Sequence, residues 1–155
     1  NYLNNGVGTA LSDWLGADAA SLSGISGSTT IGSLSIRLTG YIAIAEAGTL
    51  RFNVESDDGM ELKIGGESVT SYDGDRGFGG SPASAEFSEA GLYQIELIYW
   101  ANDQGSSGLK FSWNAADPGT LDVVPQASLY SVIPAPSALG VLGMAGLVAA
   151  RRRRN

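Results

Sequence analysis

The strongest constraint on this chain is a repeated alternation of apolar and polar residues with a period of two. Five runs show it, at 34–44, 50–54, 60–64, 93–99 and 109–113. Within them every second residue is a large apolar or aromatic one, except for Gly40. This period is typical of a β-strand that buries one face. Because several such strands bury their faces against each other, the pattern predicts an all-β fold, an antiparallel β-sandwich.

The composition agrees with short strands joined by tight turns. The chain has 155 residues with 22 glycines, and only 16% of its residues are charged, whereas about 25% is usual. So few charges disfavour a helical bundle, whose outer faces carry Glu, Lys and Arg. Asp58-Gly59 is a hairpin signal between two strands, and Gly65-Gly66 predicts a second turn. Residues 73–82 are expected to form a loop rather than a strand.

The net charge of −7 averages two unlike parts of the chain. All sixteen acidic residues lie between Asp13 and Asp122, and four of the nine basic ones are Arg151 to Arg154. Without those arginines, five basic and sixteen acidic residues leave a net charge of −11. An acidic surface repels phosphate backbones. We therefore expect no nucleic-acid partner.

Two missing residue types narrow the chemistry. The chain has no Cys and no His, which excludes disulfides, thiolate nucleophiles and Ser–His–Asp catalysis. Carboxylate chemistry and calcium binding through oxygen ligands remain. A glycosidase with two carboxylates is a remote alternative, because Asp57 and Asp58 are adjacent and do not obviously flank a scissile bond at the required separation of about 5–9.5 Å. The expectation is a protein that is not an enzyme.

Asp57-Asp58 is the best candidate site on chemical grounds. Two neighbouring carboxylates repel each other unless solvent or a cation separates them, and calcium takes six to eight oxygen ligands. The alternative is structural, since Asp followed by Gly is also good turn chemistry. Among the aromatics, Tyr99 and Trp113 fall on apolar stripes and are expected in the core. Trp100 points the other way and is the better candidate for ligand binding.

The last 24 residues change character abruptly. Residues 132–137 form a Pro-rich spacer around Pro134-Ala135-Pro136, residues 138–150 carry no charge, and Arg151, Arg152, Arg153 and Arg154 follow. An apolar stretch stopped by arginines predicts a hydrophobic helix at a membrane.

This order of Pro motif, apolar helix and arginine cluster resembles the PEP-CTERM sorting signal of bacteria. The resemblance implies transient anchoring in the membrane, cleavage by an exosortase-type enzyme, and delivery to the cell surface or extracellular matrix. A plain C-terminal membrane anchor is the alternative. Because the chain begins at Asn1 rather than Met, we expect its start to be trimmed or part of a longer chain.

The body, residues 1–131, resembles the PA-fourteen (anthrax protective-antigen-like) domain family, best over 40–129. The segments that carry the resemblance are 40–42, 47–52, 56–66, 89–93, 98–100 and 108–113. The resemblance implies a jelly-roll β-sandwich of a kind found in toxins, glycosidases, proteases and adhesins, several of which bind glycans.

In the adhesin branch of that family, the matching Asp pair is joined by a cis peptide bond and holds calcium, which chelates sugar hydroxyls. The resemblance therefore implies a calcium site at Asp57 and Asp58. It adds an Asn from the loop after the Tyr-containing strand, for which Asn102 is the best match and Asp103 the substitute. Asn102 and Trp100 are then the expected ligand contacts.

The resulting hypothesis is a bacterial module, sorted to the surface or the matrix, that binds extracellular polysaccharide or another glycan with the help of calcium. A structural surface or matrix protein without a soluble ligand is the alternative.

Overall fold

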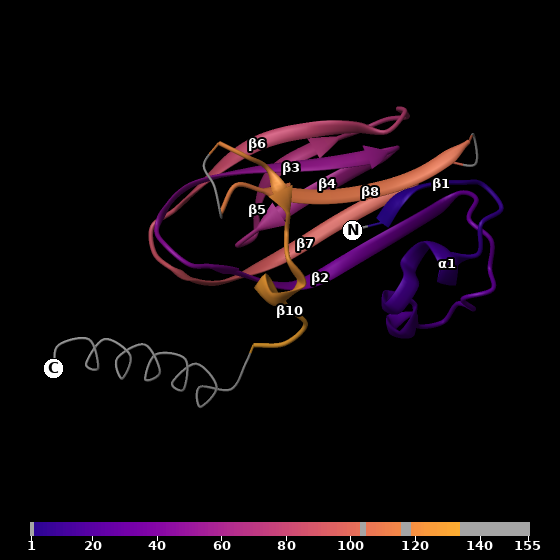
Figure 1. Ribbon diagram of the computed structural model, residues 1–155, viewed down its shortest axis with the longest axis horizontal. Coiled ribbons are helices and arrows are strands. Elements are labelled where there is room, and N and C mark those ends of the chain that lie inside the picture. Colours follow the sequence, from indigo (N-terminus) through magenta and orange to yellow (C-terminus); the bar gives the residue numbers. More distant parts are fainter. Residues whose placement is uncertain (1, 103–104, 116–118, 134–155) are drawn as a thin grey trace, which may run out of the picture.

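Two antiparallel sheets lie face to face in the computed structural model, which describes residues 2–102, 105–115 and 119–133 (Figure 1). The first sheet has the strand order β1 (Tyr2–Gly6), β8 (Ser106–Trp113), β3 (Gly48–Asp57), β6 (Gly79–Phe87), and β9 (Asp122–Val123) also pairs with β8. The second has the order β10 (Leu129–Tyr130), β2 (Leu34–Ile44), β7 (Gly91–Ala101), β4 (Gly59–Ile64), β5 (Glu67–Tyr72). The prediction of an antiparallel β-sandwich is confirmed.

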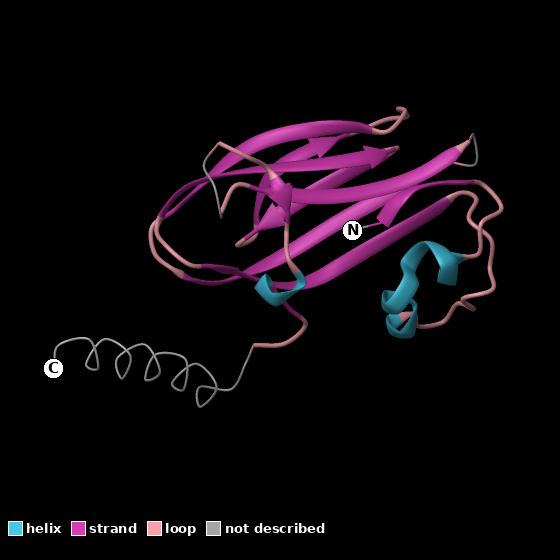
Figure 2. Cartoon of the chain, in the orientation of Figure 1, coloured by secondary structure: helices cyan, strands magenta, loops and turns pink. Residues whose placement is uncertain are grey.

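Among the described residues, helical structure is confined to short segments outside the sheets (Figure 2). They are the α-helix α1 (Leu11–Leu15) and two 3-10 helices, η1 (Gly16–Ser21) and η2 (Gln126–Ser128). The apolar residues Leu11, Trp14 and Leu15 of α1 are buried, and their spacing places them on one helix face. The helix therefore adds to the core instead of lying on the surface.

The five alternating runs are β2, β3, β4, β7 and β8, and their apolar faces form the core. Phe52 of β3, Leu62 of β4 and Tyr99 of β7 are completely buried. The centroid of the Phe52 ring lies 6.0 Å from that of Phe111 and 6.5 Å from that of Trp113, and both of these residues are on β8. Tyr99 and Trp113 are thus core residues, as their position in the alternation predicted.

The prediction of a hairpin at Asp58-Gly59 is wrong. β3 belongs to the first sheet and β4 to the second, so the chain crosses between the layers at this point. Asp57 still pairs with Gly108 of β8, whereas Gly59 already pairs with Trp100 of β7. Neither Asp58 nor Gly59 has the positive φ that a two-residue hairpin turn needs. The turn chemistry of this dipeptide serves a change of sheet.

The second turn is a true hairpin. Gly65 and Gly66 have φ values of 64° and 90° and connect β4 to β5, and such values at both central positions suit a tight hairpin.

The prediction of a loop over residues 73–82 is wrong for 79–82. Strand β6 starts at Gly79, so that only 73–78 form a loop. Gly79 and Gly80 have no side chains and so hide the alternation on which strand prediction depends. Pro82 lies opposite Asn53 of β3, and β6 is the outer strand of its sheet. An edge strand tolerates Pro, because the outward-facing N–H is not needed.

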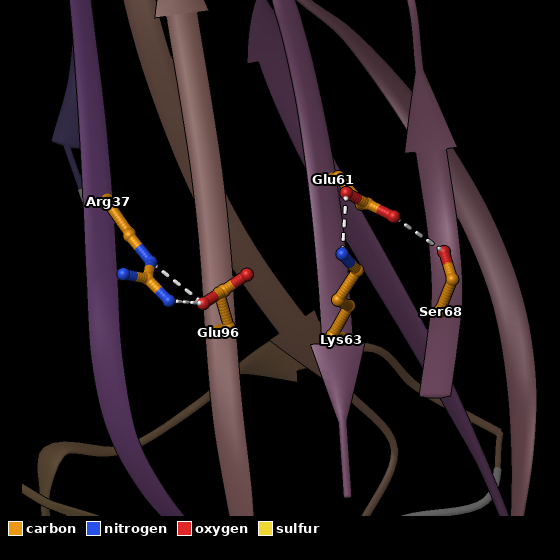
Figure 3. Close-up of polar contacts among 5 residues, drawn as sticks. All are labelled: Arg37, Glu61, Lys63, Ser68 and Glu96. Atoms are coloured by element: carbon orange, nitrogen blue, oxygen red, sulfur yellow. Dashed lines mark hydrogen bonds and ion pairs between the residues drawn. The ribbon is translucent and has the colours of Figure 1, made fainter. Parts of the chain in front are cut away.

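The outer face of the second sheet carries two pairs of opposite charges (Figure 3). Arg37 on β2 bonds to Glu96 on β7. On β4, Lys63 Nζ lies 3.2 Å from Glu61 Oε2, and Ser68 of β5 donates to Glu61 Oε1 at 3.2 Å. Each of these two carboxylates thus has a cationic partner.

The predicted sorting residues Pro134, Ala135, Pro136 and Arg151 to Arg154, with the apolar stretch between them, lie outside the described residues. No helix in the part of the chain that the structure describes has the length and apolar character to cross a membrane.

Candidate functional site

Asp57 and Asp58 lie where the chain passes from the first sheet to the second. Asp57 ends β3, Gly59 begins β4, and the peptide bond between the two Asp residues is cis, as the adhesin resemblance implied. Both residues are buried, with exposed fractions of 7% and 5%. The loops β5–β6 and β7–β8 come to the same end of the sandwich (Figure 1). Three segments distant in sequence therefore meet around this carboxylate pair.

Hydrogen bonds hold both carboxylates in place. Ser106 Oγ donates to Asp57 Oδ2 at 3.0 Å. The Arg76 main-chain N–H donates to Asp58 Oδ1, and that of Asn102 donates to Asp58 Oδ2, both at 2.9 Å. Asp58 thereby joins both loops to the end of the sandwich.

Arg76 brings a cationic side chain close to the pair, yet its guanidinium bonds to other groups. Nε donates to the main-chain carbonyls of Ser56 and Asp58 at 3.1 and 3.3 Å. Nη2 donates to Ser56 Oγ at 2.6 Å and Nη1 to Ser81 Oγ at 3.0 Å. The Tyr72 ring lies against the guanidinium, with 4.1 Å from its centroid to Cζ. Arg76 thus fixes the main chain around the Asp pair, and no ion pair within 4 Å reaches Asp57 or Asp58 in the described ranges.

The electrostatics of Asp57 follow from this arrangement. Burial raises the pKa of Asp57 above its ordinary value, and the charge of Asp58 raises it further. The hydrogen bonds from Ser106 and from the Phe78 main chain act in the opposite direction, as does the more distant charge of Arg76. Burial also lowers the pKa of Arg76. The net effect is that the Asp57 carboxyl holds its proton more readily than an exposed carboxyl does. The ionised form of this side chain would therefore be stabilised by a positive charge placed beside it.

An open depression of about 490 Å³ lies over the pair. Its polar lining consists of Asp57, Asp58, Asp75, Arg76, Asn102 and Ser106. Within residues 2–102, 105–115 and 119–133, no group of three or more Asp or Glu side chains comes together as a metal centre. A cation bound to Asp57 and Asp58 could also take amide, hydroxyl, main-chain or water oxygens as ligands.

The structure brings together three of the residues predicted for the site, Asp57, Asp58 and Asn102, while Asp103 lies outside the described residues. Trp100 is not part of the lining. A Cβ on Gly59 would lie 2.1 Å from the Trp100 indole, so that ring lies directly over the glycine, on the face of the sheet opposite the core. The expected ligand contact by Trp100 has no support in this arrangement.

Sequence reasoning missed Arg76, Ser106 and Asp75 as site residues. The only signal in the sequence was the pair of acidic residues Asp73 and Asp75 in the loop after β5. Two aromatic residues, Tyr72 and Phe78, flank residues 73–77 of this loop but are not part of the lining. Tyr72 instead lies against Arg76, and Phe78 approaches Gly108 so closely that a Cβ there would lie 2.8 Å from its ring.

The fold is a two-layer antiparallel β-sandwich, and a cis Asp57-Asp58 pair lies at one end of it below a polar depression. These features together describe one class of domain, and a comparison of the sequence with known families leads to the same class. Residues 16–126 match the model of the PA14 domain. The chain belongs to the PA14 domain family, and the match starts earlier than the segment from residue 40 that the motifs indicated.

Solved structures agree with this assignment. The PA14 domain of the MpAFP antifreeze protein is 31% identical, with 87% of this chain and 72% of that chain covered and a TM-score of 0.74. A PA14 sugar-binding domain from an RTX adhesin is 22% identical, with 86% and 76% covered and a TM-score of 0.65. The Epithelial Adhesin 6 A domain from Candida glabrata, in complex with Galb1-3GlcNAc, is 12% identical, with 71% and 57% covered and a TM-score of 0.55. The last two share the fold. No curated protein matches this chain in sequence.

Proposed function

We propose that this chain is a calcium-dependent carbohydrate-binding module of the surface or extracellular matrix of a bacterium. The observation that carries the proposal is the buried Asp57–Asp58 pair below the depression, whose carboxylates accept hydrogen bonds but have no cationic partner within 4 Å among the described residues. Buried carboxylates are normally paired with a cation or bound to a metal.

The residues present fit calcium better than a transition metal. The polar side chains that line the depression offer carboxylate, amide and hydroxyl oxygens, and the chain has neither His nor Cys. Calcium prefers such oxygen donors and accepts irregular geometry. Asp57, Asp58 and Asn102 would hold it, with Asp103 as the candidate from outside the described residues. When bound, calcium supplies coordination positions for a pair of sugar hydroxyls.

The glycan part of the proposal is supported by proteins of the same fold. The RTX adhesin domain is described as sugar-binding, and the Epithelial Adhesin 6 A domain was solved with Galb1-3GlcNAc. The open form of the depression suits an end or branch of a polysaccharide that stays largely in solvent. The proposal assigns the Asp pair to binding and gives it no catalytic role.

A calcium titration followed by thermal melting tests the metal. Wild type should melt at a higher temperature as calcium rises, since a ligand at 100 times its Kd adds about 2.7 kcal/mol of stability. Asp58→Asn should remove most of this gain. The matched control is Asp73→Asn, which should behave as wild type. Asp73 is an exposed carboxylate in the adjacent loop and is not part of the polar lining of the depression. Equal melting of wild type and Asp58→Asn with and without calcium would refute the calcium site.

A glycan array with and without a calcium chelator then tests the ligand. Binding that disappears with the chelator and with Asp58→Asn supports the whole proposal. Calcium binding without any glycan signal would favour the structural alternative, a sandwich displayed on the surface without a soluble ligand.

Export is proposed from the tail alone, and its test is separate. Deletion of Arg151–Arg154 in the producing cell should change processing and final location, while the isolated body melts as before. An unchanged fate of the tail would count against the PEP-CTERM interpretation.

A further inference from the structure

The N-terminal segment before residue 16 lies outside the matched PA14 segment, yet it packs below the Asp pair. Trp14 in α1 is only 4% exposed. Its Nε1 donates to the Leu3 carbonyl of β1 at 2.8 Å and to the Ser107 carbonyl of β8 at 3.2 Å. One indole thus ties the first helix to the first strand and to the strand that borders the site.

The Trp14 ring reaches Asp57 through one intermediate. It stacks on Tyr99 with 5.7 Å between ring centroids and 28° between ring planes. The Tyr99 hydroxyl donates to the main-chain carbonyl of Asp57 at 2.5 Å. That carbonyl belongs to the peptide bond joining Asp57 to Asp58, so the Tyr99 ring position bears directly on the orientation of the pair.

A second path leads through β8. Trp14 holds the Ser107 carbonyl, and the preceding residue, Ser106, donates its hydroxyl to Asp57 Oδ2 at 3.0 Å. The following residue, Gly108, is the partner of Asp57 in the β3–β8 register. The main-chain carbonyl and the carboxylate of Asp57 are therefore both bonded to groups that Trp14 contacts or adjoins.

We infer that Trp14 and Tyr99 are positioning residues for Asp57, so that the binding unit of this protein includes the N-terminal segment from residue 2 and extends beyond the matched PA14 segment. Tyr99 orients the Asp57 carbonyl, and Trp14 fixes both Tyr99 and the start of β8. The consequence for ligand binding rests on the proposed function, whereas the coupling of Trp14 to the site does not.

Three variants test the inference in the full chain. Trp14→Phe keeps a ring but removes the N–H and part of the stacking surface, and Tyr99→Phe removes only the hydroxyl. Trp113→Phe is the matched control, a buried Trp in the same core, five residues beyond Gly108 along β8. All three are expected to lower stability, so melting alone does not discriminate among them.

The first readout needs no ligand. Amide chemical shifts of Asp58, Asn102 and Ser106 in the calcium-free protein should move in Trp14→Phe and Tyr99→Phe and stay in place in Trp113→Phe. The second readout is calcium affinity by calorimetry, which should fall about tenfold in the first two variants and not in the control. In the double variant the loss should be less than the sum, because both residues act on one carbonyl.

The outcomes separate the two claims. If wild type binds no calcium, the proposed function fails, and the amide shifts still decide the positioning role. If Trp14→Phe moves the three site amides no more than Trp113→Phe does, or leaves calcium affinity at the wild-type value, the positioning inference is overturned.

Discussion

Carboxylates in two regions of this molecule have opposite surroundings. On the outer face of the second sheet, Glu96 and Glu61 are each within ion-pair distance of a basic side chain, Arg37 and Lys63 (Figure 3). At the end of the sandwich, Asp57 and Asp58 are more deeply buried and receive only hydrogen bonds. Among the described residues, the protein thus places two carboxylates without a cationic partner within 4 Å at buried positions, where solvation is weak.

The difference is the physical reason for choosing the Asp pair, rather than the sheet face, as the candidate site. Each exposed ion pair on the sheet face already contains one positive and one negative side chain, so it needs no bound ion to be neutral. Water and salt also screen the charges of these exposed side chains. A buried acidic pair with fixed orientation has no such relief, and it is stable enough to exist because Arg76 and two loops secure the surrounding main chain. In the proposed function, the local cost of this arrangement is offset when a cation binds.

The largest expected effect is a difference in the free energy of unfolding between variants of Arg76 and of Arg37. Arg76→Met removes the guanidinium donors to the Ser56 and Asp58 carbonyls and to the hydroxyls of Ser56 and Ser81, while Ser56 Oγ still donates to the Asp58 carbonyl. The variant should cost about 2–3 kcal/mol, because several buried or half-buried acceptors each lose a charged donor. Arg37→Met removes one exposed ion pair and should cost less than about 0.5 kcal/mol. Urea unfolding of both variants at equal ionic strength measures the contrast. Equal losses would show that Arg76 is not a structural anchor of the site.

A smaller effect of opposite sign is expected at Asp57. Its folded-state pKa is raised, mainly by burial, so the folded protein binds this proton more tightly than the unfolded chain does. The stabilising contribution is complete below the ordinary pKa of 3.8 and is lost as pH rises through the raised value. At pH 7 without calcium, Asp57→Asn should therefore be more stable than wild type.

Unfolding of wild type and Asp57→Asn at several pH values checks this sign. The advantage of the variant should shrink as the solution becomes more acidic, and saturating calcium should reverse the order at pH 7. An advantage that grows towards low pH would contradict the raised pKa.

The strands could be predicted from the sequence wherever apolar and polar side chains alternate along them. Phe52, Val54, Leu62 and Leu97 alternate with polar residues and gave their strands directly. Gly79 and Gly80 carry no such signal, and β9 and β10 have only two residues each, so these strands depend on partners that are distant in sequence. The error at Asp58-Gly59 has the same origin, because the dipeptide fits a bend but does not specify which sheet receives the next strand.

The candidate site was predictable where one segment carries it. Asp57 and Asp58 are adjacent and stand out chemically, and the family resemblance added Asn102. Arg76 and Ser106 come from two other segments, and only the tertiary structure brings them to the pair. Trp14 lies 43 positions before Asp57, and the polar, Gly-rich segment around it gave no indication of what the indole would touch.

The smallest effect should come from the paired carboxylates on the sheet face. Glu96→Gln leaves an amide able to accept a hydrogen bond from Arg37, whose side chain is 68% exposed, so the loss should stay below about 0.5 kcal/mol and vanish in about 1 M salt. Calcium affinity should equal that of wild type, since neither Glu96 nor Arg37 lines the depression. Chemical unfolding at low and high salt, with a calcium titration of the same variant, measures both. If Glu96→Gln weakened calcium binding as much as Asp58→Asn does, overall negative charge would explain the affinity, and the buried pair would lose its special status.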